Sequence, residues 1–144
     1  MLQVEIINQS ATRVPRQFLL AKVKEIYREL VRRKIKIKAQ QQLTVVFLDL
    51  EPARELNFRY RQKSYATDVL SFDGSSPEEL GELVLCPQVL KEQAREHGLT
   101  YQQELTYMVL HGILHLLGYD HEKSKRQEKV MFAIQDEIFE KISP

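Results

Sequence analysis

Alternating and helically spaced apolar residues divide the first third of the chain into three elements. Leu2, Val4 and Ile6 alternate with polar neighbours, which predicts a strand with one buried face. From Arg16 to Val31 the apolar residues recur at helical spacing, which predicts a helix. The run 43–50 is continuously apolar and rich in β-branched residues, as expected for a strand buried on both faces. Strand, helix and strand in this order predict a parallel pair joined by a right-handed crossover.

The pattern beyond residue 50 predicts further helices and strands. Pro52 and Pro87 suit the first turn of a helix. The segment 74–77, Gly-Ser-Ser-Pro, predicts a turn, and the strand after it is interpreted as a candidate edge of the sheet. The expected helices cover 52–61, 87–97, 100 to the glycine at 118, and 123–142, and the expected strands cover 69–72 and 80–85.

The helix that begins near residue 100 has a defined start and a defined apolar face. Thr100 and Gln103 have the spacing of a capping box. Its apolar positions are Leu105, Val109, Ile113 and Leu116. Together the expected elements run β-α-β-α-β-β-α-α-α, which predicts one α+β domain over residues 1–144, with a small mixed four-stranded sheet packed with about five helices.

Composition narrows the class of protein. A chain of 144 residues suits one domain with one core. Its 21 basic and 20 acidic side chains give a net charge of +1, so overall charge indicates neither an obligate nucleic-acid binder nor a membrane-surface protein. Cys86, the sole cysteine, excludes an intramolecular disulfide and is expected as a buried thiol. Without a signal peptide or membrane span, the chain is expected to be a cytoplasmic protein, a monomer or weak oligomer.

One basic run departs from this balanced charge. It begins with Arg28 and continues through Arg32, Arg33, Lys34, Lys36 and Lys38. A solvated helix end followed by a loop is the favoured interpretation, and a surface that faces a polyanion is the alternative.

Three of the four histidines have the spacing of a metal site. His111 and His115 are four residues apart, so both imidazoles lie on one helical face. Gly118 is expected to end the helix in the left-handed conformation and to return the chain so that His121 reaches the same ion. Three nitrogens leave a fourth position for water, whose pKa zinc lowers from near 16 to roughly 7. The sequence thus predicts one catalytic Zn²⁺, although imidazoles also accept nickel, copper or iron. His97 is left out as a helix-end cation.

The histidine pattern matches the ligands of the metzincin proteases but lacks their general base. In that signature a glutamate follows the first histidine, and here the residue is Gly112. A small zinc metalloprotease or peptidase therefore stays an alternative without an identified base.

Two stretches resemble one family. Residues 56–63, Leu-Asn-Phe-Arg-Tyr-Arg-Gln-Lys, continue into 67–72, Thr-Asp-Val-Leu-Ser-Phe, and with 111–121 they resemble the YbeY family of bacterial metal-dependent endoribonucleases. The resemblance extends to Leu80–Leu83 and to the helix of Met131. Departures from the family pattern fall at Ser64, Ala66, Asp73 and Glu82, none of them a predicted metal ligand.

The resemblance implies a function and a catalytic residue. It implies a zinc-dependent single-strand endoribonuclease that matures the 3′ end of small-subunit ribosomal RNA and acts in ribosome quality control, with RNA, the small ribosomal subunit and its proteins as partners. It also implies a functional role for Arg61, which chemistry suits to a bidentate phosphate clamp. A surface ion pair is the alternative for Arg61.

Several polar residues near these motifs have open roles. Asp120 is interpreted either as an acceptor that orients a histidine ligand or as a turn residue. The remaining candidates for lining the cleft or sharing a phosphate are Arg59, Asp68, Ser71 and, with the weakest support, Glu82. A third hypothesis for the whole protein is a non-catalytic ribosome-assembly factor that the metal only stabilises.

Overall fold

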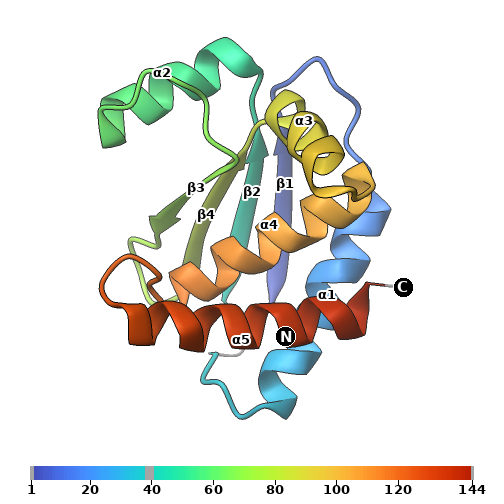
Figure 1. Ribbon diagram of the computed structural model, residues 1–144, viewed down its shortest axis with the longest axis vertical. Helices are drawn as coiled ribbons and strands as arrows, with labels where there is room; N and C mark the ends of the chain where they lie inside the picture. The colour runs from blue at the N-terminus through green and yellow to red at the C-terminus, as the bar shows by residue number, and fades with distance from the viewer. Residues whose placement is uncertain (1, 38–40, 144) are drawn as a thin grey trace.

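The computed structural model describes residues 2–37 and 41–143, and Figure 1 shows how their elements are arranged. The predicted element order is confirmed. The elements are β1 (Gln3–Asn8), α1 (Arg16–Arg32), β2 (Gln42–Phe47), α2 (Leu50–Arg61), β3 (Val69–Asp73), β4 (Glu79–Leu85), α3 (Pro87–His97), α4 (Tyr101–Leu116) and α5 (Lys125–Ile142).

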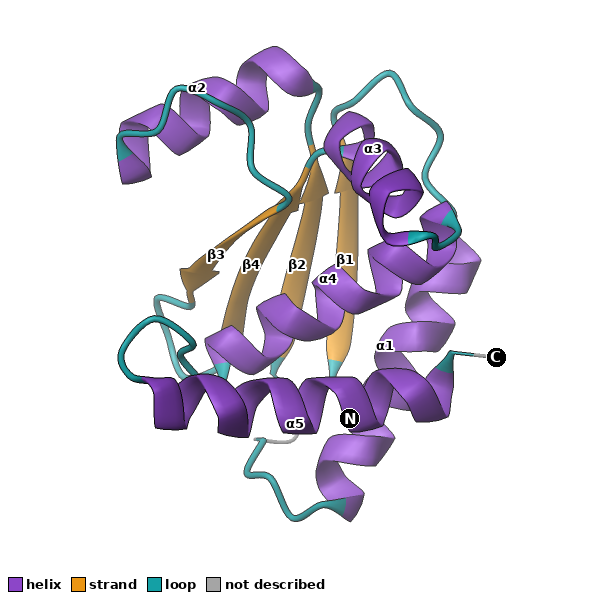
Figure 2. Ribbon diagram, viewed as in Figure 1, coloured by secondary structure: helices purple, strands orange, loops and turns teal. Residues whose placement is uncertain are grey.

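The four strands form one mixed sheet in the order β1-β2-β4-β3, as Figure 2 shows. β1, β2 and β4 are parallel, which confirms the predicted parallel pair, and β3 is antiparallel to β4. The interpretation of 80–85 as an edge strand is wrong, because β4 lies between β2 and β3. Leu83, Val84 and Leu85 are all buried, so this strand is covered on both faces, as continuous apolar strands of parallel sheets are.

Helices cover the two faces of the sheet unequally. On one face α1, α4 and α5 enclose the main core, and α4 crosses the strands obliquely (Figure 1). On the other face a small cluster of Val46, Leu70 and Val84 packs with Leu56 of α2. This arrangement confirms the α+β class with its mixed sheet and five helices. It also brings one end of α2, the segment before β3, and α4 and α5 around a common hollow.

The ends of the elements follow from local chemistry. Pro87 opens α3 and Gly98 ends it with φ 67°, in agreement with the prediction. Thr100 accepts from Gln103 N and the reciprocal bond is present, so the predicted capping box is confirmed. The second helix begins at Leu50, so Pro52 lies in its first turn as predicted. The last helix begins after Ser124, whose hydroxyl accepts from Gln127 N.

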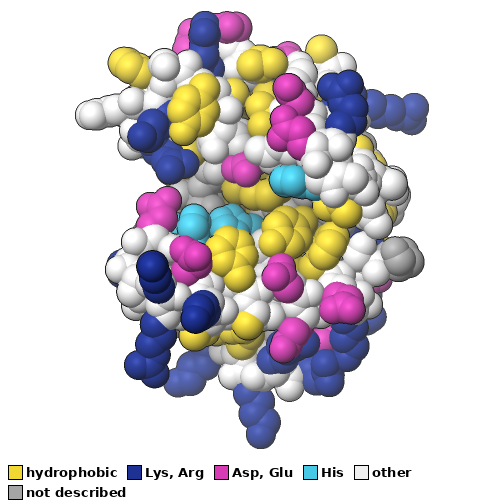
Figure 3. Space-filling model, in the orientation of Figure 1, with side chains coloured by type: hydrophobic (Ala, Val, Ile, Leu, Met, Phe, Trp, Pro, Cys, Tyr) yellow, Lys and Arg dark blue, Asp and Glu magenta, His cyan; other side chains and the backbone are white. Residues whose placement is uncertain are grey.

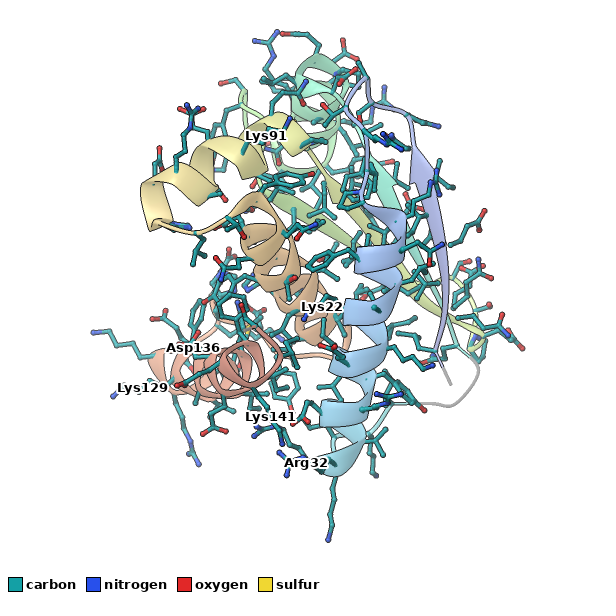
Figure 4. All side chains as sticks on the ribbon, turned by 90° about the vertical axis from the view of Figure 1, so that its right-hand side faces the viewer. Lys22, Arg32, Lys91, Lys129, Asp136 and Lys141 are labelled. Atoms are coloured by element: carbon teal, nitrogen blue, oxygen red, sulfur yellow. The ribbon has the colours of Figure 1, made fainter. Side chains whose placement is uncertain are left out.

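Two residues of the basic run, Arg32 and Arg33, form ion pairs. Arg32 Nη2 lies 3.0 Å from Glu29 Oε1 on α1, and Arg33 Nη1 lies 2.7 Å from Glu137 Oε2 on α5. Lys141 of α5 lies 3.4 Å from Glu29, and Figure 4 shows it beside the end of α1 that carries Arg32. This part of the run therefore joins α1 to α5, while Lys38 lies outside the described residues. In the described chain no helix has the length and apolarity needed to cross a bilayer.

Candidate metal centre

Helix α4 places two of the predicted ligands on its solvent side. Leu105, Val109 and Ile113 are completely buried on the opposite side. His111 and His115 are four residues apart and therefore lie one turn from each other on the side that faces the hollow. Burial of the apolar face thus fixes the direction in which both imidazoles point.

A tight turn returns the chain to these two histidines. α4 ends at Leu116, and Gly118 follows with φ 102°, a conformation that favours glycine. Tyr119 N donates to Leu114 O at 3.1 Å and closes the turn. The predicted role of Gly118 at the helix end is therefore confirmed, and the turn leads directly to His121.

The three imidazole rings converge. The ring centre of His121 lies 5.1 Å from that of His111 and 6.4 Å from that of His115. Within the described chain, no group of three or more His, Cys, Asp or Glu side chains is arranged so that it could hold a metal ion. Zinc requires nitrogens at about 2.0–2.1 Å, so ligation of one ion needs these rings to rotate toward a common point. The metal assignment of His111, His115 and His121 accordingly stays a prediction.

Gln135 orients the first imidazole. Nδ1 of His111 donates to Oε1 of Gln135 at 3.0 Å, and Gln135 is completely buried on α5. With Nδ1 protonated in this bond, Nε2 carries the lone pair that a metal requires. Burial is the main cause that lowers the pKa of His111, and the neighbouring His121 and His115 lower it further, against the opposing effect of the bond to Gln135. Burial and these neighbours favour the neutral imidazole, which is the ligating form.

The third imidazole has an unsatisfied atom. Nδ1 of His121 is buried and has no hydrogen-bond partner within the described chain. Phe132 of α5 lies beside it, with ring centres 5.8 Å apart. A buried polar nitrogen without a partner is costly, and a cation bound at Nδ1 would remove that cost. The donor set therefore fits a borderline-soft divalent ion such as zinc.

The guanidinium of Arg61 lies at the same place, at the end of α2. Its Nη2 lies 3.9 Å from Oε1 of Glu122, and Nε2 of His121 lies 3.8 Å from that same oxygen. Glu122 therefore stands between the cationic side chain and the histidines. Arg61 thus has a carboxylate neighbour, as a surface ion pair requires, and it also lines the same cleft as the predicted metal ligands, as a phosphate clamp requires.

These residues line one cleft of about 740 Å³, a size typical of ligand sites. Figure 3 shows the histidines along a hollow that crosses this face of the molecule. The wall combines polar and apolar side chains from four helices, from the turn between α4 and α5, and from the segment 65–72. Among the lining residues are Tyr60, Arg61, Asp68, Ser71, His97, Met108, His111, His115, His121, Glu122 and Phe132.

The other candidates are divided between this cleft and the rest of the surface. Asp68 and Ser71 line the cleft, as the sequence suggested. Arg59 lines a different hollow beside Phe58, and Glu82 lines a third one beside Asp73. Neither Arg59 nor Glu82 is therefore placed to meet a ligand held by the histidines.

Asp120 is a turn residue. Its Oδ1 accepts from Glu122 N at 2.8 Å, and this backbone bond is the main cause that lowers the pKa of Asp120. This geometry is typical of an Asx turn. The orienting role considered for Asp120 belongs instead to Gln135. Sequence analysis missed it, although a glutamine among the apolar positions of the last helix was a usable signal.

Gly112 points away from the cleft. A Cβ atom at this position would lie 2.6 Å from Cδ2 of Leu83, which is completely buried in β4. The position next to the first histidine therefore faces the core, and a side chain there has no room. The structure gives no site at residue 112 for the general base of a metzincin.

The fourth histidine lies in the same cleft but outside the group of three. His97, the last residue of α3, donates through Nδ1 to Oε1 of Glu104 at 2.8 Å. Glu104 is completely buried in the first turn of α4. Its hydrogen bond and charge are the main causes that raise the pKa of His97. Nearby, burial and the Asp136 carboxylate raise the pKa of Tyr107 to about 12.

Comparisons with known proteins identify the family of the chain. The family model described as Endoribonuclease YbeY matches residues 5–143. An endoribonuclease YbeY of Bdellovibrio bacteriovorus is 56% identical over 142 residues, which cover 96% of this chain and 94% of the relative. One from Petrotoga mobilis is 33% identical, covering 98% and 96% of the two chains. The solution structure of TM1509 from Thermotoga maritima superposes with a TM-score of 0.65 at 32% identity, covering 97% of this chain and 87% of that one. The chain belongs to the YbeY family.

Proposed function

We propose that this chain is a zinc-dependent endoribonuclease that cleaves single-stranded RNA in the cleft of the three histidines. The observation that carries the proposal is the convergence of three imidazoles and the guanidinium of Arg61 in one cleft. The name shared by the family model and the relatives supports the reaction class. His111, His115 and His121 would hold the ion, which would act as a Lewis acid toward water or a phosphate oxygen.

Arg61 has the role of a phosphate clamp in this proposal. A phosphodiester under attack concentrates negative charge on its non-bridging oxygens, and a guanidinium donates two parallel hydrogen bonds to such a group. Arg61 lies at the end of α2 and its side chain is 43% exposed, so it can reach a strand in the cleft. Gln135 keeps His111 in the ligating tautomer through the bond to Nδ1.

The proposal extends to the substrate. We place the activity in the cytoplasm, in maturation of the 3′ end of small-subunit ribosomal RNA and in ribosome quality control, as the family resemblance implies. The net charge of +1 supports weak, salt-dependent binding of RNA alone. Proteins of the small ribosomal subunit would then supply the remaining affinity.

The test compares the wild-type chain with His111→Ala and Arg61→Ala, after metal analysis of protein purified without chelator. Each protein is loaded with zinc and incubated with structured ribosomal RNA and, separately, with casein. Arg59→Ala is the matched control, because it removes the same charge from the same helix outside the cleft. All variants are purified in parallel to exclude a contaminating nuclease.

The proposal predicts zinc in the wild-type chain and RNA cleavage that is lost in His111→Ala and Arg61→Ala but kept in Arg59→Ala. Equal cleavage by every variant would overturn it. Casein hydrolysis would indicate the peptidase alternative, for which residue 112 offers no base. Absence of both activities would indicate the non-catalytic assembly factor.

A further inference from the structure

A further polar side chain, His97, lines the cleft of the predicted metal ligands. This side chain is 53% exposed and lines the same cleft as the three histidines. Its Nδ1 is engaged by Glu104, so the hydrogen bonds described for this ring leave Nε2 without a protein partner. His97 therefore presents Nε2 to the cleft, as a donor when the ring is an imidazolium and as an acceptor when it is neutral, and neither the metal site nor Arg61 uses this atom.

The buried carboxylate of Glu104 fixes the orientation of the His97 ring. It is completely buried, and only its Oε1 has a partner, whereas Oε2 has none within the described chain. Burial of a carboxylate is costly unless a partner compensates it. Glu104 lies in the first turn of α4, where the helix dipole favours negative charge. The pair fixes the orientation of His97, with Nδ1 toward the protein and Nε2 on the opposite side of the ring.

Apolar side chains form the cleft wall together with His97 and the metal ligands. Val69 contributes from β3, Tyr107 and Met108 contribute from α4, and Phe132 contributes from α5. Phe132 stacks against His111 with ring centres 6.1 Å apart. Flat aromatic groups bind to such surfaces, and proteins that read single-stranded RNA stack bases on aromatic side chains.

The charges around His97 disfavour a second phosphate there. The charged groups that raise the pKa of this imidazole are all carboxylates, namely Glu104 of α4, Glu96 of α3 and Asp68 before β3. A phosphate would meet these carboxylates as well as the imidazole. An uncharged acceptor, such as a carbonyl or ring nitrogen of a nucleobase, takes the Nε2 hydrogen bond without that repulsion.

We propose that the cleft holds a subsite for a nucleobase flanking the scissile phosphate, with the base against the apolar wall and Nε2 of the His97 imidazolium donating to one of its acceptors. Glu104 is the positioning residue for His97. The inference rests on the proposed endoribonuclease function, because it needs an RNA strand in the cleft. It assigns base preference to His97 and phosphate chemistry to Arg61 and the histidines.

The experiment measures equilibrium binding of short 2′-O-methylated RNAs, which are not cleaved at a ribose hydroxyl, to the zinc-loaded protein. One abasic position is moved along the strand, and fluorescence anisotropy gives the affinity. The proteins are wild type, His97→Ala, His97→Gln and Glu104→Gln. Arg95→Ala is the control, since it removes a charge from the last turn of α3 without changing His97 or Glu104.

At one position the abasic change should weaken binding to wild type about tenfold, as loss of a charge-assisted hydrogen bond does. The same change should weaken binding to His97→Ala clearly less, because only the contact with the apolar wall is then lost, and Glu104→Gln should also show a reduced penalty. His97→Gln keeps an N–H donor, so the abasic position should still weaken its binding, by less than in wild type. With cleavable RNA, His97→Ala should raise KM and leave kcat near wild type, because the subsite binds but does not react.

The inference is overturned if no abasic position distinguishes wild type from His97→Ala, or if the protein does not bind these RNAs. Zinc-dependent cleavage that is indifferent to His97 would refute the subsite alone and leave the proposed function intact. If the wild-type chain does not cleave RNA, the proposed function is refuted. The binding data would still show whether His97 contacts a base. Circular dichroism of Glu104→Gln establishes that the variant is folded.

Discussion

Oε1 of Gln135 lies 3.0 Å from Nδ1 of His111, so a residue of the last helix controls the tautomer of a predicted metal ligand on the preceding one. Gln135→Met, similar in length but without an acceptor, should lower zinc affinity by a factor of about 10 to 100. Competition with a fluorescent zinc chelator measures this change. Gln135→Glu keeps an acceptor oxygen and should bind zinc more tightly than Gln135→Met. Equal affinity of the two variants would show that the hydrogen bond does not orient the ligand.

Glu122 competes with a substrate phosphate for Arg61. Its carboxylate lies 3.9 Å from the Arg61 guanidinium and 3.8 Å from the His121 ring. Glu122→Gln should raise RNA affinity by a factor of about two to five, within the range of an exposed ion pair, with a larger effect at low salt. Glu55→Gln, the same change on α2 outside this cleft, should have a smaller effect. Unchanged or weaker binding in Glu122→Gln would contradict the competition.

Gly112 packs directly against the side chain of Leu83. Gly112→Ala places a methyl group 2.6 Å from Leu83, in a fully buried contact, and should destabilise the fold by about 1–3 kcal/mol. Urea unfolding measures the free energy. Leu83→Val in the same chain removes part of the clash, so the double variant should be more stable than the sum of the two single effects predicts. A neutral Gly112→Ala would mean that Leu83 moves aside freely.

The pair of His97 and Glu104 should make stability depend on pH. Glu104 raises the pKa of His97 in the folded state. A raised histidine pKa contributes stability that is fully present below the unfolded pKa, about 6.5, and is lost as pH rises through the folded pKa. The difference in Tm between wild type and His97→Gln should therefore shrink from pH 6 upward. Thermal unfolding at several pH values measures it, and a constant difference would exclude the linkage.

Sequence patterns predicted the elements better than their order in the sheet. The range of α3 was predicted because Pro87 and Gly98 define its ends through local backbone chemistry. The neighbours of β4 were not, because strand order depends on packing between distant segments, and the exposed Glu82 in that strand is compatible with an edge.

Similarly, the three candidate ligands follow from spacing along one helix and its turn. The residues around them do not follow from spacing. Gln135 meets His111 from another helix, and Glu122 is set between Arg61 and His121 only by the folded turn. Contacts of this kind depend on how the elements pack against one another, which no local pattern records.

The three histidines lie on two different elements, a buried helix and a turn, and this difference should affect the rate of metal release. His111 and His115 belong to a helix whose inner face is sealed in the core, whereas His121 follows the turn at Gly118. Any cation held by all three rings would therefore leave by first losing His121, when the turn moves. His111 and His115 would still hold it at that stage. The rate of metal release would then report motion of residues 117–121 rather than unfolding of the protein.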